Sequence, residues 1–514
     1  MSALGQLLAP SHLAAAHLVL SALVLLWNIV MAGRIATRHD TPPVLGALSA
    51  VGGLLVAPAL FIVWASGSLL TGRALHTIAW AWPLAAAIIA AQAIAALVLR
   101  RTAFPIGFAI AAYDVLLAVI YTLRYLVYTG DTVPDTVLGL AAAQSGALSV
   151  TAHPLAIVLP YYLHVPILAP ASPGRRGMGT VLRSAVAMVA GGWAATIAGA
   201  VLLSTQAVRS YAMFEGERLT ERDRNEFTVG LKLFPTLDGP PSMLAIQSDV
   251  ALADSIGVGA VSVYIAPDGA RGRALDSLAR ALEPIRTERL LIVALDLASG
   301  DPPAEGATID QYLAARVQDI GRIARRLRPD LVVPVVDPYG AARRRLGVIA
   351  EADWKQYLTR SADAARAAGA RTSVLAHVGG FTPQDSTLFA WATSASSPVS
   401  GAGITLRPWY SGATALRGRM DAADRWMQAS PPAKPVWVLE AGGFPTVHGD
   451  ASLSRTLLGS LAWATRHPVV RGVVIFEASD YEARMGLRAP GGRIRPAATS
   501  LSRAVRALGE SSGS

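Results

Sequence analysis

Cysteine is absent from all 514 residues, and charged residues make up only 16% of the chain. The lack of cysteine excludes disulfides, a thiolate nucleophile and a cysteine-ligated zinc site. The charge content is far below the roughly 25% that is usual for soluble proteins. Because 53% of the residues are hydrophobic, the composition points to a membrane protein and excludes a disordered chain.

Lysine is also scarce, with three among 45 basic residues, although the net charge is +10. The arginines are scattered, and no basic run is interleaved with aromatic residues. A nucleic-acid-binding surface normally concentrates its basic residues on one face or element. We therefore expect no nucleic-acid partner.

Charge is scarcest in residues 1–207, which contain nine arginines, four aspartates and neither lysine nor glutamate. As helices, five apolar runs in this part would each be long enough to cross a hydrocarbon layer of about 30 Å. They lie near 13–33, 44–66, 76–99, 103–128 and 180–203. The stretch 136–170, interrupted by Pro154, Pro160 and Pro166, predicts a short surface or re-entrant helix and one bent crossing. The sequence thus predicts an all-α transmembrane bundle of about six spans over 1–207.

The arginines also predict an orientation, because positive residues are retained on the cytoplasmic side during insertion. Seven arginines follow span one, follow span three or precede span six, whereas the opposite connections hold only Arg73. Both termini are therefore expected outside the cytoplasm. The protein is predicted to be a multi-pass protein of the cytoplasmic (inner) membrane, in contact with lipid, with a periplasmic or extracellular C-terminal domain.

Two ionisable residues fall inside the fourth predicted span. Asp114 and Arg124 are functional candidates because charges at such depth are costly, and they leave a transport role open. A structural interpretation is that Asp114 pairs with a polar neighbour between helices and that Arg124 reaches the interface. We expect His153 and His164 to be bundle residues rather than metal ligands.

The C-terminal part repeats a strand and a helix eight times. After a polar linker at 208–226, β-rich apolar runs begin near 228, 260, 289, 330, 371, 402, 434 and 470. Segments with helical periodicity lie between them. Eight such units predict a closed (β/α)8 TIM barrel over 227–508, followed by a disordered tail at 509–514, whereas an open doubly wound sheet more often has five to seven strands.

Active sites of such barrels gather where the strands end. The residues at these ends are Lys232, Phe234, Tyr264, Asp296, Asp337, His377, Arg407, Trp409, Tyr410, Glu440, Glu477 and Asp480. Paired carboxylates suit glycoside chemistry, in which one group protonates the leaving oxygen and the other attacks or activates water at the anomeric carbon. Aromatic rings can stack on sugar rings. The set therefore predicts a carbohydrate site.

Several motifs carry a resemblance to a known family. They are V-G-L-K-L-F-P-T-L-D-G-P-P-S (Val229–Ser242), R-P-W-Y (Arg407–Tyr410), V-L-E-A-G-G-F-P-T (Val438–Thr446), F-E-A-S-D-Y-E-A-R (Phe476–Arg484) and M-G-L-R-A-P-G-G-R-I-R-P-A (Met485–Ala497). Together they resemble glycoside hydrolase family 17, the β-1,3-glucanases and their bacterial glucanosyltransferase relatives. The resemblance covers roughly residues 225–508.

This resemblance implies that Glu440 is the nucleophile of a retaining mechanism and that Phe444 offers an aromatic face to the sugar. It also implies an acid/base glutamate in a Gly-Asn-Glu motif after strand four. Here Asp337 stands in its place and the asparagine is missing. An aspartate withdraws its carboxyl by about 1–1.5 Å, and a misplacement of ~1 Å can cost about 10²-fold in rate.

Structural roles stay open for several of these residues. Asp337 could cap the following turn, since Pro338 comes next. Glu477 and Asp480 could form an ion pair with Arg484 or Lys232. Arg407 could neutralise Glu440 and keep it ionised. His377 and Asp296 could belong to the core. Only one of the neighbours Trp409 and Tyr410 could line the mouth within a strand, because adjacent strand residues point opposite ways.

The favoured hypothesis is a membrane-anchored, extracytoplasmic glycoside hydrolase or transglycosylase that acts on a β-glucan-type polysaccharide. A polysaccharide synthase or export complex is a candidate partner. The competing hypothesis is a non-catalytic glycan-binding or scaffold subunit of such a complex, because the Asn-Glu motif is absent. We expect no cofactor and no metal, since no histidine and carboxylate group has ligand spacing on one element.

Overall fold

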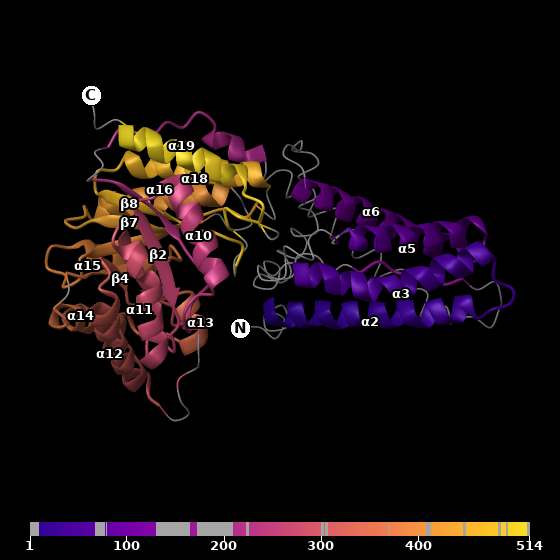
Figure 1. The fold of residues 1–514 in the computed structure, drawn as a ribbon, viewed down its shortest axis with the longest axis horizontal. Helices are drawn as coiled ribbons and strands as arrows, with labels where there is room; N and C mark the ends of the chain where they lie inside the picture. Colours follow the sequence, from indigo (N-terminus) through magenta and orange to yellow (C-terminus); the bar gives the residue numbers. More distant parts are fainter. Residues whose placement is uncertain are drawn as a thin grey trace.

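The computed structural model describes residues 10–66, 78, 80–129, 165–171, 209–222, 226–299, 303, 307–369, 371–407, 413–445, 449–481, 485–489 and 492–510. Two architectures follow one another along the chain. Apolar helices come first, and a closed barrel of parallel strands surrounded by helices comes second (Figure 1). The predicted fold class, an α-helical bundle followed by a (β/α)8 barrel, is confirmed.

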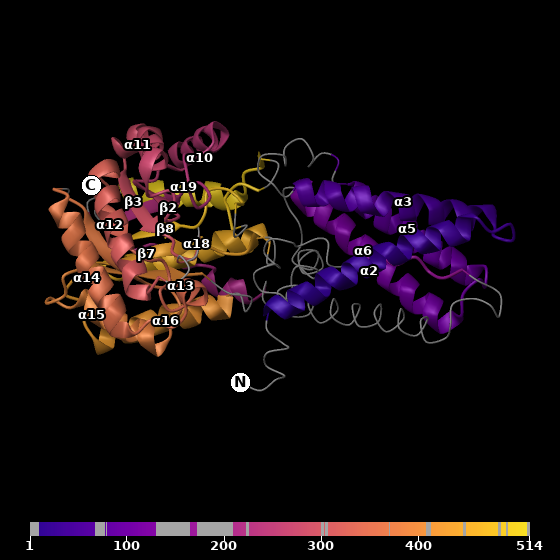
Figure 2. The ribbon, with the colours of Figure 1, turned by 90° about the horizontal axis from the view of Figure 1, so that it is seen from below.

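The N-terminal helices are α2 (Pro10–Ala36), α3 (Pro43–Ser66), α5 (Ala81–Val98) and α6 (Phe104–Thr129). They pack side by side in a bundle (Figure 2). The last three are long and apolar enough to cross a membrane, and α2 contributes a shorter apolar stretch, Ser21–Ala36. The spans predicted near 180–203 and over most of 136–170 lie outside the described residues, so the count of six stays a prediction.

A short segment that is neither helix nor strand, Val165–Ala171, is buried among these helices. Pro166 and Pro170 cannot donate the backbone hydrogen bonds of a helix, so the described end of the predicted 136–170 crossing is not helical. Irregular backbone is tolerated at membrane depth only where protein groups satisfy its hydrogen bonds. Side chains of the bundle do so here.

Five polar side chains contact this segment. Asn28 donates to the carbonyl of Pro166 at 2.8 Å and accepts from the N–H of Leu168 at 2.8 Å. Gln92 likewise donates to the Ala169 carbonyl (3.0 Å) and accepts from its N–H (2.9 Å). The remaining contacts are Trp27 Nε1 to the Leu168 carbonyl, Tyr113 Oη to the Val165 carbonyl and the Ile167 N–H to Asp114 Oδ1.

Asp114 therefore has a polar neighbour between helices, as its structural interpretation predicted, although the partner is a backbone N–H and not a side chain. Its second oxygen, Oδ2, is buried without a hydrogen-bond partner in the part of the chain that the structure describes. The side chain of Arg124 lies outside the described residues, as do His153 and His164.

Replacing Gln92 by leucine should destabilise the bundle. Leucine leaves both the N–H and the carbonyl of Ala169 buried without partners, at a cost of about 1–3 kcal/mol for each group. Unfolding of the full chain in mixed detergent micelles, followed by tryptophan fluorescence, measures the loss. Ile94→Leu, on the exposed side of the same helix, is the matched control, and equal stability of the two variants would contradict this role of Gln92.

The barrel is closed, with its strands in sequence order and β8 paired with β1. The strands are β1 (Thr228–Lys232), β2 (Ala260–Ile265), β3 (Leu290–Leu295), β4 (Leu331–Val333), β5 (Ser373–Val378), β6 (Gly401–Leu406), β7 (Val436–Ala441) and β8 (Val470–Ile475). Each begins within about two residues of the predicted position. Their hydrophobic runs were recognisable because a parallel strand covered on both faces is apolar throughout.

Helices cover the outside of the barrel (Figure 1). They are α10 (Met243–Ile256), α11 (Gly272–Arg286), α12 (Ile309–Leu327), α13 (Ala341–Leu346), α14 (Glu351–Ala367), α15 (Pro383–Thr393), α16 (Ala413–Ala429), α18 (Asp450–Thr465) and α19 (Pro496–Glu510), with a 3-10 turn, η1 (Tyr211–Phe214), before β1. Helix α19 continues to Glu510, two residues beyond the predicted end of the barrel.

Local signals fix where several helices begin. Thr308 and Gln311 form a reciprocal capping box at α12, which satisfies two backbone N–H groups of the first turn. Ser242 caps α10 by accepting from the N–H of Ala245, and Gly257 ends that helix with a φ of 82°. Only glycine adopts such a left-handed conformation without steric cost.

Two hydrophobic layers result from the alternation of side chains along the strands. In β2, Val261, Val263 and Ile265 face the helices, whereas Ala260 and Tyr264 belong to a separate cluster inside the barrel. The interior is therefore a packed core and not a pore, as in other eight-stranded barrels. Its upper layer, at the C-terminal strand ends, is the part that carries polar residues.

Candidate active site

An extra residue in β7 turns Glu440 into the barrel. Along the β6–β7 ladder Ile404 pairs with Val438 but Thr405 pairs with Glu440, so Leu439 has no ladder partner of its own. Strict alternation would point Leu439 and Glu440 to opposite faces of the strand. The bulge of one residue lets both side chains point into the barrel. Leu439 packs in the interior cluster. A Cβ at Gly403 would collide with it, so the glycine makes room for the bulge.

Three side chains hold the carboxylate of Glu440, which is 2% exposed. Tyr264 Oη donates to Oε1 at 2.7 Å, and Thr405 Oγ1 donates to Oε2 at 3.1 Å. Arg407 forms an ion pair with Oε2 at 2.8 Å. The partners come from β2, β6 and the residue after β6, so the closed barrel is what brings them together.

The electrostatic balance keeps Glu440 ionised. Burial by itself would raise the pKa of this carboxyl, but the charge of Arg407 and the hydrogen bonds from Tyr264 and Thr405 outweigh burial, and the pKa is lowered. Burial and the adjacent carboxylate raise the pKa of Tyr264 well above its ordinary value, so its hydroxyl remains a donor. A retaining glycosidase needs an ionised carboxylate as its nucleophile.

A hydrogen-bond relay continues from Glu440 across the barrel. The N–H of Asp337 lies 2.8 Å from His377 Nδ1, and His377 Nε2 lies 3.1 Å from Thr405 Oγ1. A backbone N–H can only donate, so Nδ1 must accept and the proton of the neutral ring sits on Nε2. Nε2 then donates to Thr405, whose hydroxyl donates to Glu440. His377 is buried, as a core role predicts, and at the same time orients the hydroxyl that binds the carboxylate.

Asp337, the predicted acid/base residue, is engaged with the backbone of its own loop. Its Oδ2 accepts from the N–H of Ala341 at 2.8 Å and so caps α13. The residue has a φ of 46°, and a Cβ at Gly340 would collide with its carboxylate. Oδ1 is buried without a hydrogen-bond partner among the described residues. Within the same residues, no hydrogen bond joins the Asp337 carboxyl to that of Glu440; the relay through His377 and Thr405 reaches only the backbone N–H of Asp337.

Lys232 and Glu477 pair with each other next to Tyr264, one of the residues that hold Glu440. Their charged atoms lie 3.4 Å apart and both side chains are fully buried. Lys232 Nζ also donates to the Phe234 carbonyl and lies over the rings of Tyr264 and Phe476, at 5.1 and 4.7 Å from the ring centroids. The structural role predicted for Glu477, an ion pair with Lys232, is therefore what the structure shows.

Three further candidate residues take part in core packing or in a local turn. The side chain of Phe234 is fully buried in the core between strands and helices, and Phe444 is buried in the interior cluster, so neither ring presents an open face. Asp296 closes a local turn by accepting from the N–H of Ala298 and from the Ser299 hydroxyl. Trp409 and Tyr410 lie outside the described residues.

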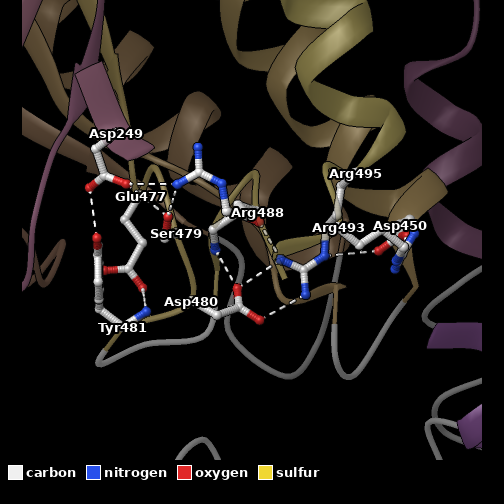
Figure 3. A network of polar contacts seen from close by, with 10 residues as sticks. Asp249, Asp450, Glu477, Ser479, Asp480, Tyr481, Arg488, Arg493 and Arg495 are labelled. Carbon is white, nitrogen blue, oxygen red and sulfur yellow. Dashed lines mark hydrogen bonds and ion pairs between the residues drawn. The ribbon is translucent and has the colours of Figure 1, made fainter. Parts of the chain in front are cut away.

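Asp480 belongs to a polar network that anchors the segment after β8 (Figure 3). Its two oxygens receive Arg495 in a bidentate pair at 2.7 and 2.8 Å, and both side chains are almost completely buried. Arg495 in turn reaches Asp450 at the start of α18. Asp480 was expected to pair with Lys232 or Arg484. The pairing with Lys232 is wrong, because Lys232 pairs with Glu477. Arg484 lies outside the described residues.

The other half of this network centres on Asp249 of α10. Its carboxylate accepts from Ser479 and Arg488 through Oδ1, and from Tyr481 and the N–H of Phe234 through Oδ2. Figure 3 shows Glu477 beside this group, with its carboxylate next to the N–H of Tyr481. The segment that follows β8 is therefore tied to two helices, α10 and α18.

Two site residues escaped the sequence reasoning. Thr405 could have been found, because it alternates with Gly403 on the inward face of β6, two residues before Arg407. Arg419 of α16 gives no local signal; it donates to the carbonyls of Gly379 and Thr405 at 2.9 and 3.1 Å. Burial lowers the pKa of Arg419 to about 10, a value at which the guanidinium still carries its charge at neutral pH.

The described residues contain no group of three or more histidine and acidic side chains that could hold a metal ion. No family model and no curated protein matches the chain. Solved glycoside hydrolases are similar to about half of this chain. A β-glucuronidase from Ruminococcus gnavus in complex with D-glucuronic acid is 12% identical, covering 54% of this chain and 48% of that one, with a TM-score of 0.39.

Two other structures show the same degree of similarity. β-Glucuronidase 2 of Bacteroides uniformis, covalently bound to cyclophellitol-6-carboxylate aziridine, is 12% identical over 55% of this chain and 35% of that one, at a TM-score of 0.42. XacCel5A in complex with cellopentaose is 15% identical over 54% and 98%, at 0.38. This chain spans about half the length of the Ruminococcus gnavus enzyme, or less for the Bacteroides uniformis one. These values do not assign the chain to a family, and family 17 membership stays a prediction.

Replacing Arg407 by glutamine should lower the stability of the barrel at neutral pH and make that stability less sensitive to acid. The lowered pKa of Glu440 means that its ionised form stabilises the fold above the unfolded-state pKa, and that this stabilisation is lost as the pH falls through the folded-state pKa. Without Arg407, burial dominates and raises the folded-state pKa of Glu440 above its unfolded-state value, so the variant loses most stability at neutral pH and approaches the wild type as the pH falls. Thermal unfolding of both proteins between neutral and acidic pH measures the shift. Arg366→Gln, at an exposed ion pair, should leave the profile unchanged; an Arg407→Gln profile like the wild type would exclude this balance.

Replacing Asp480 by alanine tests its structural role. The change leaves the Arg495 guanidinium buried without its main partner, and breaking such a pair costs about 3–5 kcal/mol. Urea unfolding of the barrel should show a loss of this size. If Asp480 instead contacted sugar, the variant would keep its stability and lose oligosaccharide affinity in calorimetry.

Proposed function

We propose that the protein is a membrane-anchored carbohydrate-active enzyme in which Glu440 is the nucleophile of a retaining glycosidase or transglycosylase. The observation that carries this proposal is the ionised, almost completely buried Glu440 at the C-terminal end of β7, held by Arg407, Tyr264 and Thr405. A carboxylate in the barrel interior is costly. A fold that devotes three polar side chains to keeping it ionised favours a chemical role over a packing role.

In the proposed reaction, one carboxylate oxygen of Glu440 attacks the anomeric carbon while the glycosidic oxygen leaves and takes up a proton. The glycosyl-enzyme is then opened by water, which gives hydrolysis, or by a sugar hydroxyl, which gives transfer. Tyr264 and Thr405 keep the carboxylate oriented. We assign the proton donor to Asp337 through Oδ1, the oxygen without a hydrogen-bond partner in the described part of the chain.

The membrane setting and the substrate belong to the same proposal. Three described helices are long and apolar enough to span a membrane. The arginine distribution favours an inner-membrane protein whose barrel lies outside the cytoplasm. The motifs similar to family 17 favour a β-glucan-type polysaccharide. A synthase or an export complex that delivers such a chain is the proposed partner.

A second candidate function is glycan binding without cleavage, as a scaffold subunit of a secretion complex. It is favoured by the engagement of Asp337 Oδ2 with the N–H of Ala341. An aspartate that caps a helix has one carboxylate oxygen held by the backbone. If its other oxygen cannot approach the glycosidic bond, no acid is available and the ionised Glu440 would only bind sugar.

Two substrates separate the roles of the carboxyls. The full chain in detergent is given laminari-type oligosaccharides and, separately, a 2-fluoro-glucosyl fluoride, which accumulates the covalent intermediate because its second step is slow. The mass of the peptide that contains Glu440 should increase by one fluoroglucosyl group. Glu440→Gln should lower oligosaccharide turnover at least ~10³-fold and remove the adduct.

Asp337→Asn should lower oligosaccharide turnover by about 10²–10⁴-fold and still form the adduct, because fluoride leaves without protonation. Wild-type turnover in this variant would leave Asp337 as a helix cap only. Calorimetric binding of oligosaccharide by the wild type, with neither turnover nor adduct, would support the binding function and exclude the enzymatic one.

A further inference from the structure

The barrel exposes few large apolar side chains, and most of those described lie on one face. Between residues 228 and 510 they are Met243, Leu244, Leu290, Val348 and Ile494. Met243 and Leu244 begin α10 after β1, Val348 follows α13 after β4, and Ile494 follows β8. All four therefore belong to connections at the C-terminal strand ends, which we call the mouth face. Leu290 begins β3 at the opposite end.

Two of these residues are unusually exposed for apolar side chains. Val348 is 78% exposed and Met243 is 67% exposed. They stand on opposite sides of the mouth, because β1 and β4 are separated by two strands in one direction and four in the other. Apolar side chains on both sides of one face indicate a partner surface that covers the whole face. A ligand in a single small groove would contact apolar side chains on one side only.

The mouth face also carries the densest basic run of the described chain. Arg343, Arg344 and Arg345 are consecutive in α13, and Arg343 and Arg344 are exposed. Among the described residues, no carboxylate forms an ion pair with Arg343 or Arg344. Glu351, the next acidic residue along the chain, is occupied by Lys355 at 2.5 Å and by the Thr387 hydroxyl at 2.9 Å. Arg343 and Arg344 therefore keep their charge available to a partner.

Exposed arginines beside protruding apolar side chains match the chemistry of a membrane interface. The guanidinium groups bind anionic headgroups while the apolar side chains enter the acyl boundary, and the long arginine stems let the charge reach the headgroup level. The barrel is joined covalently to helices that can span a membrane. Such a tether makes the contact intramolecular and raises its effective concentration.

We propose that the mouth face of the barrel, defined by Met243, Leu244, Arg343–Arg345, Val348 and Ile494, docks on the anionic lipid surface of the membrane in which the chain is anchored. The docking does not depend on the proposed function. Together with that function it names the substrate class. With Glu440 at the same end of the barrel, the glycan that reaches it is one carried at the bilayer surface, such as a glycolipid or a membrane-borne polymer, and not one diffusing freely.

The absence of cysteine makes a direct test feasible. Single cysteines are introduced in the full chain as Val348→Cys and Met243→Cys, with Leu290→Cys as the matched control on the opposite face, and each is labelled with an environment-sensitive fluorophore. The proteins are placed in nanodiscs of phosphatidylglycerol and phosphatidylcholine in equal parts. Brominated lipid should quench the labels at 348 and 243 several-fold more than the label at 290.

Equal quenching at 348 and 290 would overturn the docking proposal. Adding Arg343→Gln and Arg344→Gln to the Val348→Cys protein, or using phosphatidylcholine alone, should reduce the quenching; if neither does, the contact is not with anionic lipid and the proposal fails. Quenching that a soluble uronic-acid oligosaccharide abolishes would make the arginines a glycan site and would overturn it too. Oligosaccharide turnover in the same nanodiscs is measured separately, so a failure of the proposed function is distinguishable.

Discussion

A charged carboxylate that water hardly reaches is stable only when other groups of the protein replace its hydration. At Glu440 this replacement comes from Arg407, Tyr264 and Thr405. No two of these residues are neighbours in the chain, and Tyr264 lies on a different strand from the segment that carries the other two. The rest of the site follows from this requirement: the bulge at Leu439 points the carboxylate inward, and Gly403 leaves the space that the bulge needs.

The same requirement governs the helical N-terminal part. There the buried groups are peptide N–H and carbonyl groups of the non-helical segment Val165–Ala171, and Asn28 and Gln92 each make two hydrogen bonds to them. In both parts, polar side chains are placed inside an apolar core to complete groups that cannot reach water. Asp114, which stands out in the sequence as an ionisable residue within a span, is one of these side chains.

Much of the architecture could be predicted from local pattern. The apolar runs identified α3, α5 and α6, and eight strand beginnings were located within about two residues, because buried parallel strands and membrane helices are uniformly apolar. The strand ends also pointed to Glu440, Tyr264, His377 and Arg407, all of which meet in one site. Their roles did not follow. Asp480 is an acidic residue that follows a strand end, but it is buried and pairs with Arg495. The position of a residue after a strand does not tell which side chain it will pair with.

The sequence by itself determined the order of elements, the apolar helices of the N-terminal part, the eight strand–helix units and the end of the barrel at which polar residues gather, since these depend on hydrophobic period and run length. Only the tertiary structure decided that Thr405 and His377 connect Glu440 to Asp337, that Lys232 belongs to Glu477, and that Arg419 of α16 reaches the site. The physical reason is that these contacts join residues far apart in sequence. Closure of the barrel and a one-residue bulge set their directions, and neither leaves a periodic signal in the chain.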